Sequence, residues 1–307
     1  MIRQPIIAGV DGSAESRRAA WLAWRIARLV DAQCVLVHAV PDVWAPSGIA
    51  PLMNGAEIFD RVSADLRQSL ARHFGAGVSE GAGRELVVRS GRPGVVLDAV
   101  AREYEAGLII VGGCHHGALP RGFGGSTAHY LARTSPAPVL VVGPEGSIPR
   151  RILVATDLAA AASPVLSTAW RYADLLTAQL RVVHVIEPAP FPTGVSLDRH
   201  AFEVWSRREF HRLVELELPR VPPANRVVRR GHADEEIAEE AAAWRADLIV
   251  IGSQGSGGMD RMLIGSTTER LFHRLPASLL VVPVNQPAAS TRPQSRRRSG
   301  QTEAVPL

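Results

Sequence analysis

Five glycines follow one apolar run in the C-terminal part of the chain. The stretch IGSQGSGGMDRMLIGST, residues 251–267, ends the run ADLIVI and precedes the helical pattern TERLFHRL. A strand, a glycine-rich turn and a helix start form an anion site, because backbone N–H groups converge there and the helix dipole favours negative charge. The lysine of the Walker loop is missing, since the chain contains no lysine. The stretch therefore predicts a phosphate-binding loop of another kind.

The spacing in this loop is G-x2-G-x9-G-S/T, formed by Gly252, Gly255 and Gly265 with Ser266 and Thr267 after them. The first two glycines permit positive φ and let the main chain approach a ligand without a Cβ in the way. The last glycine and the two hydroxyl residues would open the following helix and offer N–H and O–H groups to phosphate oxygens. The alternative is that these glycines only form a turn after a strand.

The chain contains the same unit twice, which favours the functional interpretation of the loop. Three identical pairs stand 146 positions apart (157 − 11): Asp11 with Asp157, Trp24 with Trp170, and His38 with His184. Further on the separation is 140 (252 − 112), as for Gly112 with Gly252 and Gly125 with Gly265. A whole domain is therefore duplicated, and not a short solenoid repeat. The expected domains are residues 1–145 and 149–285, followed by a basic tail, 286–307, whose Pro/Ser/Arg-rich composition predicts disorder.

Each unit alternates short apolar runs with amphipathic stretches, one of which opens at Ser13, a candidate helix cap. The pattern predicts an α/β fold of two tandem doubly wound domains, each a five-stranded parallel sheet with helices on both faces. In such sheets ligands bind beyond the carboxyl ends of the strands, where the strand order reverses. Asp11 and Gly112 fall at such ends in the first unit, and Asp157 and Gly252 do so in the second.

Composition narrows the class of protein. The net charge is +4, but several of the arginines responsible stand in the tail, so nucleic-acid binding by the folded domains is not expected. The apolar runs are too short to span a bilayer, and no leader pattern precedes the first strand. Two cysteines, Cys34 and Cys114, fit a reducing compartment, and Cys34 is expected in the core. The chain is therefore expected to be cytoplasmic.

These motifs resemble those of the universal stress protein family (UspA) in its tandem two-domain form. The resemblance rests on GVDGS at residues 9–13, VHV at 183–185 and the glycine spacing before a helix, and it covers nearly all of residues 4–285. It implies a Rossmann-like fold that binds ATP, with or without Mg²⁺. The motif would hold the ribose and phosphates, the strand-end aspartate would lie at the nucleoside, and a main-chain group after the second strand would meet adenine.

Carried onto this chain, the resemblance assigns nucleotide-binding residues in both domains. In the second domain they are Asp157, Val185, Gly252, Gly255, Gly265, Ser266 and Thr267. In the first domain they are Asp11, Ala39, Gly112, Gly125, Ser126 and Thr127, with alanine at 39 where a valine is usual.

The first domain departs from the pattern within its glycine loop. The position equivalent to Gly255 is His115 (255 − 140), whose Cβ and imidazole would narrow the cradle. We therefore expect weaker or absent nucleotide binding in domain 1. Arg121 and Arg261 occupy the same place in the two loops (261 − 121 = 140). Each could replace the missing lysine by pairing with a phosphate, or could simply face solvent.

The resemblance leaves three interpretations of function. The first is a nucleotide-dependent regulatory module in stress response or dormancy. The second is a slow ATPase or an autophosphorylating protein, which is less expected because Asp11 and Asp157 have no second acidic residue nearby in the loop to build a metal pair. The third is an interaction-only protein that has lost nucleotide. We expect no catalytic residue and no protein metal site, although CHH occurs at 114–116.

Association follows from the last strand of each unit, PVLVVG or SLLVVPV, which is apolar and would lie at a sheet edge. The resemblance implies that such strands pair, so the two domains are expected to form an internal pseudo-dimer. A homodimer of the whole chain and an unidentified protein partner are further expectations.

Overall fold

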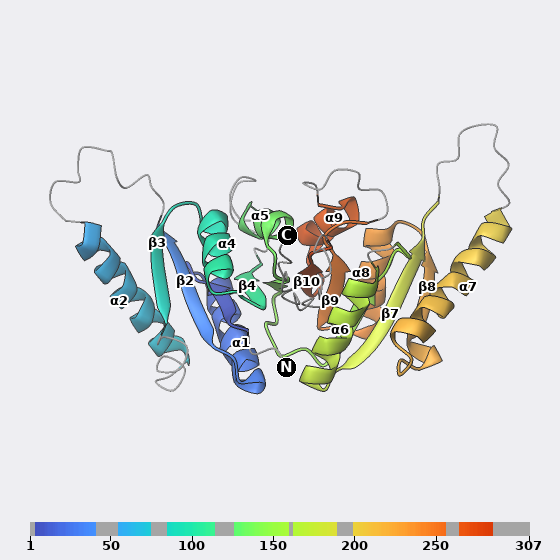
Figure 1. Ribbon diagram of the computed structural model, residues 1–307, viewed down its shortest axis with the longest axis horizontal. Coiled ribbons are helices and arrows are strands. Elements are labelled where there is room, and N and C mark those ends of the chain that lie inside the picture. Colours follow the sequence, from blue (N-terminus) through green and yellow to red (C-terminus); the bar gives the residue numbers. More distant parts are fainter. Residues whose placement is uncertain are drawn as a thin grey trace, which may run out of the picture.

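The computed structural model describes most of the chain and places its two halves side by side (Figure 1). The described residues are 4–40, 55–74, 85–113, 126–159, 162–188, 199–255 and 264–284. The predicted tail, 286–307, therefore lies outside the described residues.

The N-terminal half alternates strands and helices as its periodicity predicts. Its strands are β1 (Ile6–Gly9), β2 (Cys34–Val40), β3 (Leu86–Ser90), β4 (Leu108–Gly112) and β5 (Val139–Val142). Its helices are α1 (Ala14–Val30), α2 (Gly55–Phe74), α4 (Pro93–Glu103) and α5 (Ser126–Thr134). The predicted cap is confirmed, because the Ser13 hydroxyl at the start of α1 accepts from the N–H of Ser16 at 3.1 Å.

The C-terminal half repeats this order. Its strands are β6 (Arg151–Ala155), β7 (Gln179–Ile186), β8 (Arg226–Arg230), β9 (Leu248–Gly252) and β10 (Ser278–Val282). Its helices are α6 (Ala162–Leu176), α7 (Arg199–Glu217), α8 (Ala233–Trp244) and α9 (Ser266–Arg274), with one turn of 3₁₀ helix at Pro223–Asn225.

The ten strands of the described residues form one sheet, in the order β3-β2-β1-β4-β5-β10-β9-β6-β7-β8. Within each half the pairing is parallel, so the predicted doubly wound order is confirmed. The halves meet where β5 and β10 pair antiparallel, with Leu280 opposite Leu140. The two apolar edges thus protect each other, and the expected pairing of the last strands is confirmed. Strand order reverses between β1 and β4 and again between β6 and β9.

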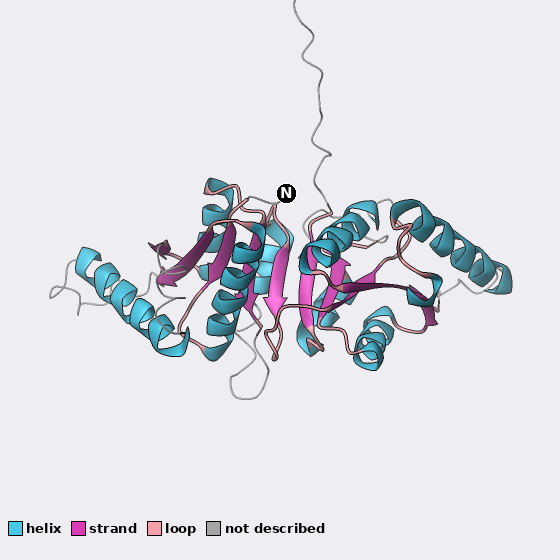
Figure 2. Cartoon of the chain, turned by 90° about the horizontal axis from the view of Figure 1, so that it is seen from below, coloured by secondary structure: helices cyan, strands magenta, loops and turns pink. Residues whose placement is uncertain are grey.

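Helices cover both faces of the sheet, as Figure 2 shows from below. Successive strand residues point to opposite faces, so Ile6 packs in one core cluster and Ile7 in the other. The first cluster takes side chains from α1, α2, α6 and α7, and the second takes them from α4, α5, α8 and α9. Each cluster runs through both halves, which makes the two domains one packed body.

Cys34 and the apolar runs are both subjects of sequence-based expectations. Cys34 lies at the margin of the first cluster and has no disulfide partner, and burial raises the pKa of its thiol to about 12. It is therefore a small packing residue rather than a reactive thiol. Within the described residues, no helix combines the length and the apolar character needed to cross a membrane.

Candidate functional site

A cavity of about 520 Å³ opens at the strand-order reversal of the C-terminal half, between the ends of β6 and β9. Its lining combines the end of β6, the end of β7, the start of α8, the glycine loop and the first turn of α9. The lining residues are Ala155, Thr156, Asp157, Ala162, Val165, Val183, Val185, Glu187, Ala233, Ile237, Ile251, Gly252, Gln254, Gly255, Ile264, Gly265, Ser266, Thr267 and Thr268. Every second-domain residue that the sequence assigned to the nucleotide, apart from Arg261, therefore lines one cavity.

Asp157 stands at the cavity mouth, two residues beyond the end of β6, and its side chain is exposed. Its Oδ1 accepts a hydrogen bond from the N–H of Ala159 at 3.1 Å, which fixes the carboxylate at the strand end. A Cβ added to Gly255 would lie 3.1 Å from the Asp157 Oδ2. The carboxylate and the glycine loop are thus in contact distance of one another, although about a hundred residues separate them in sequence.

The glycines serve close approach rather than unusual backbone angles. Neither Gly252 nor Gly255 is among the described residues with positive φ. The expectation that these two glycines adopt positive φ is therefore wrong. A Cβ on Gly265 would lie 3.4 Å from the N of Gly255, and the Gly265 N–H donates to the Ser253 carbonyl at 2.9 Å. The two ends of the loop therefore lie against each other, and glycine keeps that space narrow.

The start of α9 points N–H groups at the same space. Its N-cap is Gly265, in extended conformation, which has no side chain to accept from the first-turn N–H groups. The hydroxyl of Thr268 instead donates to the Gly252 carbonyl at 2.9 Å, which joins the helix to the end of β9. Free N–H groups at a helix start carry the positive end of the helix dipole, so this turn can bind an anion.

The opposite side of the cavity is apolar. Val165 from α6, Val183 and Val185 from β7, and Ile237 from α8 contribute side chains there, next to the end of β9 at Ile251. A flat, largely apolar ring system suits such walls, with backbone groups at the end of β7 available for its edge.

Four polar residues of the lining were not identified from the sequence, namely Thr156, Glu187, Gln254 and Thr268. Glu187 follows β7 directly, and its Oε1 accepts from the Ala233 N–H at the start of α8 at 3.0 Å. Thr156 is 8% exposed, and its buried hydroxyl has no hydrogen-bond partner among the described residues. Both differ between the repeats, since the equivalents are Pro41 (187 − 146) and Val10 (156 − 146). This difference between the repeats is the sequence signal that could have identified Glu187 and Thr156.

A histidine in each half holds the strand end that carries the aspartate. Nδ1 of His184 lies 2.9 Å from the Thr156 carbonyl oxygen, and Nδ1 of His38 lies 2.6 Å from that of Val10, so each imidazole N–H donates. Burial lowers the pKa of His184, partly offset by the Thr156 carbonyl and the charge of Asp157. His184 is therefore a neutral, structural donor in the core, as its place in the repeat predicted.

In the N-terminal half, Asp11 occupies the place of Asp157 but has a different environment. Its Oδ1 accepts from the Ser13 N–H at 2.9 Å, and its own N–H donates to the Ser16 hydroxyl at 3.2 Å. Burial raises the pKa of Asp11, but hydrogen bonds from Ser13 and Ser16 together outweigh it, so the pKa lies below its ordinary value. Asp11 is thus part of the cap of α1.

Gly112 of the N-terminal half has a packing role of its own. A Cβ there would lie 2.7 Å from the Glu15 carbonyl carbon, so only glycine lets α1 pack on the end of β4. Ala39 lies in β2, half-buried and packed against the second core cluster. Neither residue by itself indicates a ligand.

The remaining predicted residues are placed only in part. Ser126 and Thr127 begin α5, as expected from their equivalents in α9. His115, Arg121, Gly125 and Arg261 lie outside the described residues, so their roles stay predictions.

The charge of the described lining is negative, because Asp157 and Glu187 are its ionisable members and none of its described residues is cationic. Within the described part of the chain, no three His, Cys, Asp or Glu side chains gather as a metal site. Phosphate charge at this cavity would therefore be met by the α9 N–H groups and by whatever the loop at 256–263 supplies, where Arg261 stands.

The fold and this cavity define a doubly wound α/β protein with a cavity at its strand-order reversal. Comparison with known families narrows the class. The model of the universal stress protein family matches residues 3–143 and again 149–283, so the chain belongs to that family, in tandem form.

Relatives and solved structures agree with this assignment. A universal stress protein of Mycolicibacterium smegmatis is 28% identical over 304 residues, covering 90% of this chain and 96% of that protein. One of Thermus aquaticus is 30% identical over 134 residues, which are 43% of this chain and 98% of that protein. The crystal structure of a universal stress protein from Archaeoglobus fulgidus has a TM-score of 0.63 at 19% identity, covering 92% of this chain and all of that one (100%).

Proposed function

We propose that this chain is an ATP-binding universal stress protein whose C-terminal domain holds the nucleotide and acts as a nucleotide-dependent regulatory module. The observation that carries the proposal is the convergence of Asp157, the end of β7, the glycine loop and the uncapped start of α9 on one cavity. Its volume of about 520 Å³ lies within the range of small-molecule sites.

Each part of the cavity has a place for one part of ATP. The apolar walls between β7 and α8 would hold adenine, with backbone groups near Val185 at its edge. The Asp157 carboxylate would accept from ribose hydroxyls. The N–H groups of the first turn of α9, with Ser266 and Thr267, would bind phosphate oxygens, and Arg261 would pair with the terminal ones.

Mg²⁺ would enter bound to the phosphates. Asp157 and Glu187 are the carboxylates of the described lining, and Glu187 already accepts from the Ala233 N–H. A hydrolase needs a positioned metal, an oriented water and charge clamps around the γ-phosphate. The described residues supply the anion site without that set, so we propose retention of ATP with at most slow hydrolysis or autophosphorylation.

The N-terminal domain is proposed to be the weaker or empty one. Its Asp11 is held by the serine cap, and His115 replaces the glycine that in the other half lies against the aspartate. We propose that this half supplies sheet and interface while the other half binds, and that signalling goes through an unidentified protein partner or a homodimer of the whole chain.

The test uses full-length protein purified without added nucleotide. After denaturation, released nucleotide is identified by mass spectrometry and counted per chain, and the native protein is then followed for conversion of ATP to ADP. About one ATP per chain, slowly lost, is expected from one competent site. About two would refute the impaired first domain. No nucleotide, and no uptake when ATP is added, would refute the proposal and favour an interaction-only role.

A further inference from the structure

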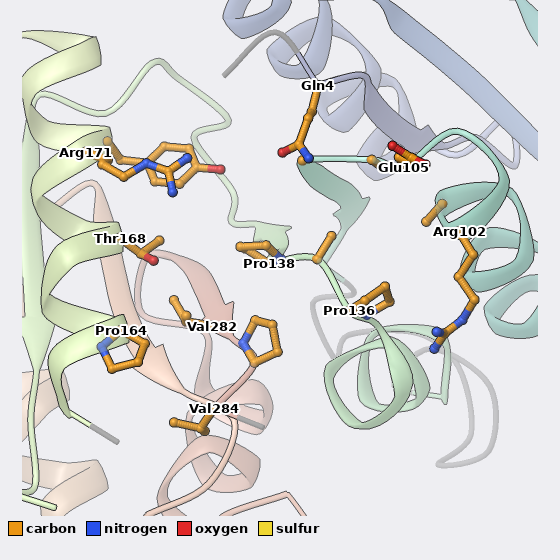
Figure 3. A pocket seen from close by; sticks show the side chains of 16 residues that line it. Gln4, Arg102, Glu105, Pro136, Pro138, Pro164, Thr168, Arg171, Val282 and Val284 are labelled. Carbon is orange, nitrogen blue, oxygen red and sulfur yellow. The ribbon is translucent and has the colours of Figure 1, made fainter. Parts of the chain in front are cut away.

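A second cavity, of about 450 Å³, lies between the two halves of the molecule (Figure 3). One wall is α6 with the end of β10, and the other is the end of α4 with the start of β5. The lining residues are Gln4, Ala101, Arg102, Glu105, Ala106, Gly107, Pro136, Ala137, Pro138, Pro164, Thr168, Arg171, Tyr172, Val282, Pro283 and Val284. Small-molecule sites occur preferentially at such domain interfaces.

The α6 wall presents polar groups that the protein does not satisfy. Thr168 is 9% exposed and Tyr172 is 4% exposed, yet neither hydroxyl has a hydrogen-bond partner among the described residues. Burial raises the pKa of Tyr172, so its hydroxyl stays protonated and can donate. Both side chains line the cavity, so a ligand there could reach the two hydroxyls.

The same wall carries one cation that is not committed elsewhere. Arg171 forms no ion pair or hydrogen bond with any described residue, and in Figure 3 its guanidinium extends into the cavity above Thr168. Arg102, on the other wall, is already engaged, with Asp98 at 3.0 Å and with the Thr134 carbonyl at 2.6 Å. Glu105 lies on that far wall too, beside Gln4. The free positive charge therefore belongs to the α6 wall.

Part of the lining is apolar. Val282 and Val284 lie on the same side of the cavity as Thr168, and Pro138 lies on the β5 side in Figure 3. An anionic head group on α6 would leave its hydrocarbon part against these three side chains, which removes apolar surface from water.

The repeat shows why the cavity is open on this side of the molecule. Repeat spacing places Ser278 and Gly143 where the cavity has Pro138 and Pro283 (278 − 140 and 283 − 140). There the Gly143 N–H donates to the Ser278 hydroxyl at 3.1 Å, which fixes the linker between the halves. Proline has no N–H and no hydroxyl, so that hydrogen bond cannot form at the cavity.

The linker then fills the equivalent space. A Cβ on Gly146 would lie 3.1 Å from the Cβ of Arg18, and Ile148 packs against the first core cluster. The Asp247 carboxylate also accepts there from the N–H groups of Arg150 and Arg151, both at 2.8 Å. Its equivalent at the cavity is Gly107 (247 − 140), which contributes no carboxylate to compete for a cation.

We propose that this cavity is a second ligand site, for a small organic anion with an apolar body, bound by the Arg171 guanidinium and the hydroxyls of Thr168 and Tyr172. The site is separate from the nucleotide cavity, shares no lining residue with it, and does not depend on the function proposed for it.

The test uses the full chain and fluorine NMR, with para-fluorophenylacetate as the anionic probe and para-fluorophenylethanol as its neutral match. We expect the carboxylate to bind and the alcohol to bind much more weakly. Arg171→Gln is expected to weaken the carboxylate roughly ten- to a hundredfold, the usual worth of a charged hydrogen bond. Tyr172→Phe is expected to weaken it several-fold. Arg25→Gln, the repeat equivalent of Arg171 (171 − 146), is the control and should leave binding unchanged.

Every sample is measured with and without saturating ATP. Displacement of the probe by ATP would overturn the proposal, because it would place the probe in the nucleotide cavity. Equal binding of the two probes, or equal losses in Arg25→Gln and Arg171→Gln, would overturn it as well. So would binding that occurs only after the chain is shortened at residue 285, because the tail would then be the occupant.

Discussion

The two halves of the molecule have the same strand order but treat the strand-end aspartate differently. Asp11 accepts from Ser13 and lies in the cap of α1, and its pKa is lowered by the hydrogen bonds there against the effect of burial. The serines at 13 and 16 correspond to Ala159 and Ala162, so no hydroxyl from these positions reaches Asp157. The two aspartates thus share the hydrogen bond from the N–H two residues on, and they differ in the serine hydroxyls that surround Asp11.

The glycines of the two halves differ in the same way. Gly112 is required because α1 packs on it, since a Cβ there would lie 2.7 Å from the Glu15 carbonyl carbon. Gly255 is required because the loop lies against Asp157. Gly112 and Gly255 stand at different positions of the repeated unit, and their neighbours in the fold show that a Cβ would meet a helix backbone at one and a carboxylate at the other.

The difference between the halves is tested most directly by exchanging the residues that differ in the glycine loop. Gly255→His is expected to lower ATP affinity on the order of a hundredfold, about 3 kcal/mol, because the new side chain starts 3.1 Å from Asp157 Oδ2. His115→Gly is expected to raise the number of nucleotides bound per chain. Isothermal titration measures both, with Gly257→His as the control in the same loop. Unchanged affinity in Gly255→His would mean that the histidine does not set the halves apart.

Gly112→Ala has the next largest expected effect, and it concerns stability. The Cβ would overlap the α1 backbone, and overpacking of this kind costs about 2 kcal/mol of unfolding free energy. Gly252→Ala is its matched control, since the nearest atoms there are the Gln254 carbonyl oxygen at 3.1 Å and Val165 Cγ2 at 3.3 Å, so a smaller loss is expected. Urea unfolding gives both values. Equal losses would show that α1 is not the constraint.

Arg261→Ala should weaken ATP roughly tenfold and leave adenosine nearly unchanged, because a guanidinium pairs with phosphate and not with the base. Arg121→Ala, at the equivalent place in the other loop, should change neither affinity if the first domain is impaired. Competition of the two ligands against a fluorescent ATP analogue measures the ratio. The same loss for ATP and adenosine would contradict a phosphate role.

The smallest effect is expected at the serine cap. Ser13→Ala should cost about 1 kcal/mol at neutral pH, the usual value for an N-cap. Because the folded pKa of Asp11 is depressed, its contribution is present above the unfolded value of about 3.9 and is lost as the pH falls through the folded value. The difference from the natural chain should therefore shrink in acid. If the loss of unfolding free energy in Ser13→Ala did not change with pH, Asp11 would not contribute to the cap.

Local sequence was sufficient for much of the fold. The apolar runs, the amphipathic stretches and the cap at Ser13 predicted the strands and helices, because periodicity reports which face of an element is buried. The separations of 146 and 140 predicted the duplication, and the strand-end positions predicted that Asp157 and Gly252 would line one site. Motif spacing was thus enough to place residues such as Asp157 and Gly252, because their positions follow from the strand that they end.

Other features depend on contacts between elements far apart in sequence. Strand order and helix packing determine the antiparallel register of β5 and β10, the place of Glu187 and Thr156 in the cavity at the end of β6, and the cavity beside Tyr172. Tyr172 belongs to an ordinary amphipathic pattern, which states that the residue is buried but not that its hydroxyl lacks a partner. The chain thus encodes its elements and their repetition locally, whereas the space between them exists only once they pack.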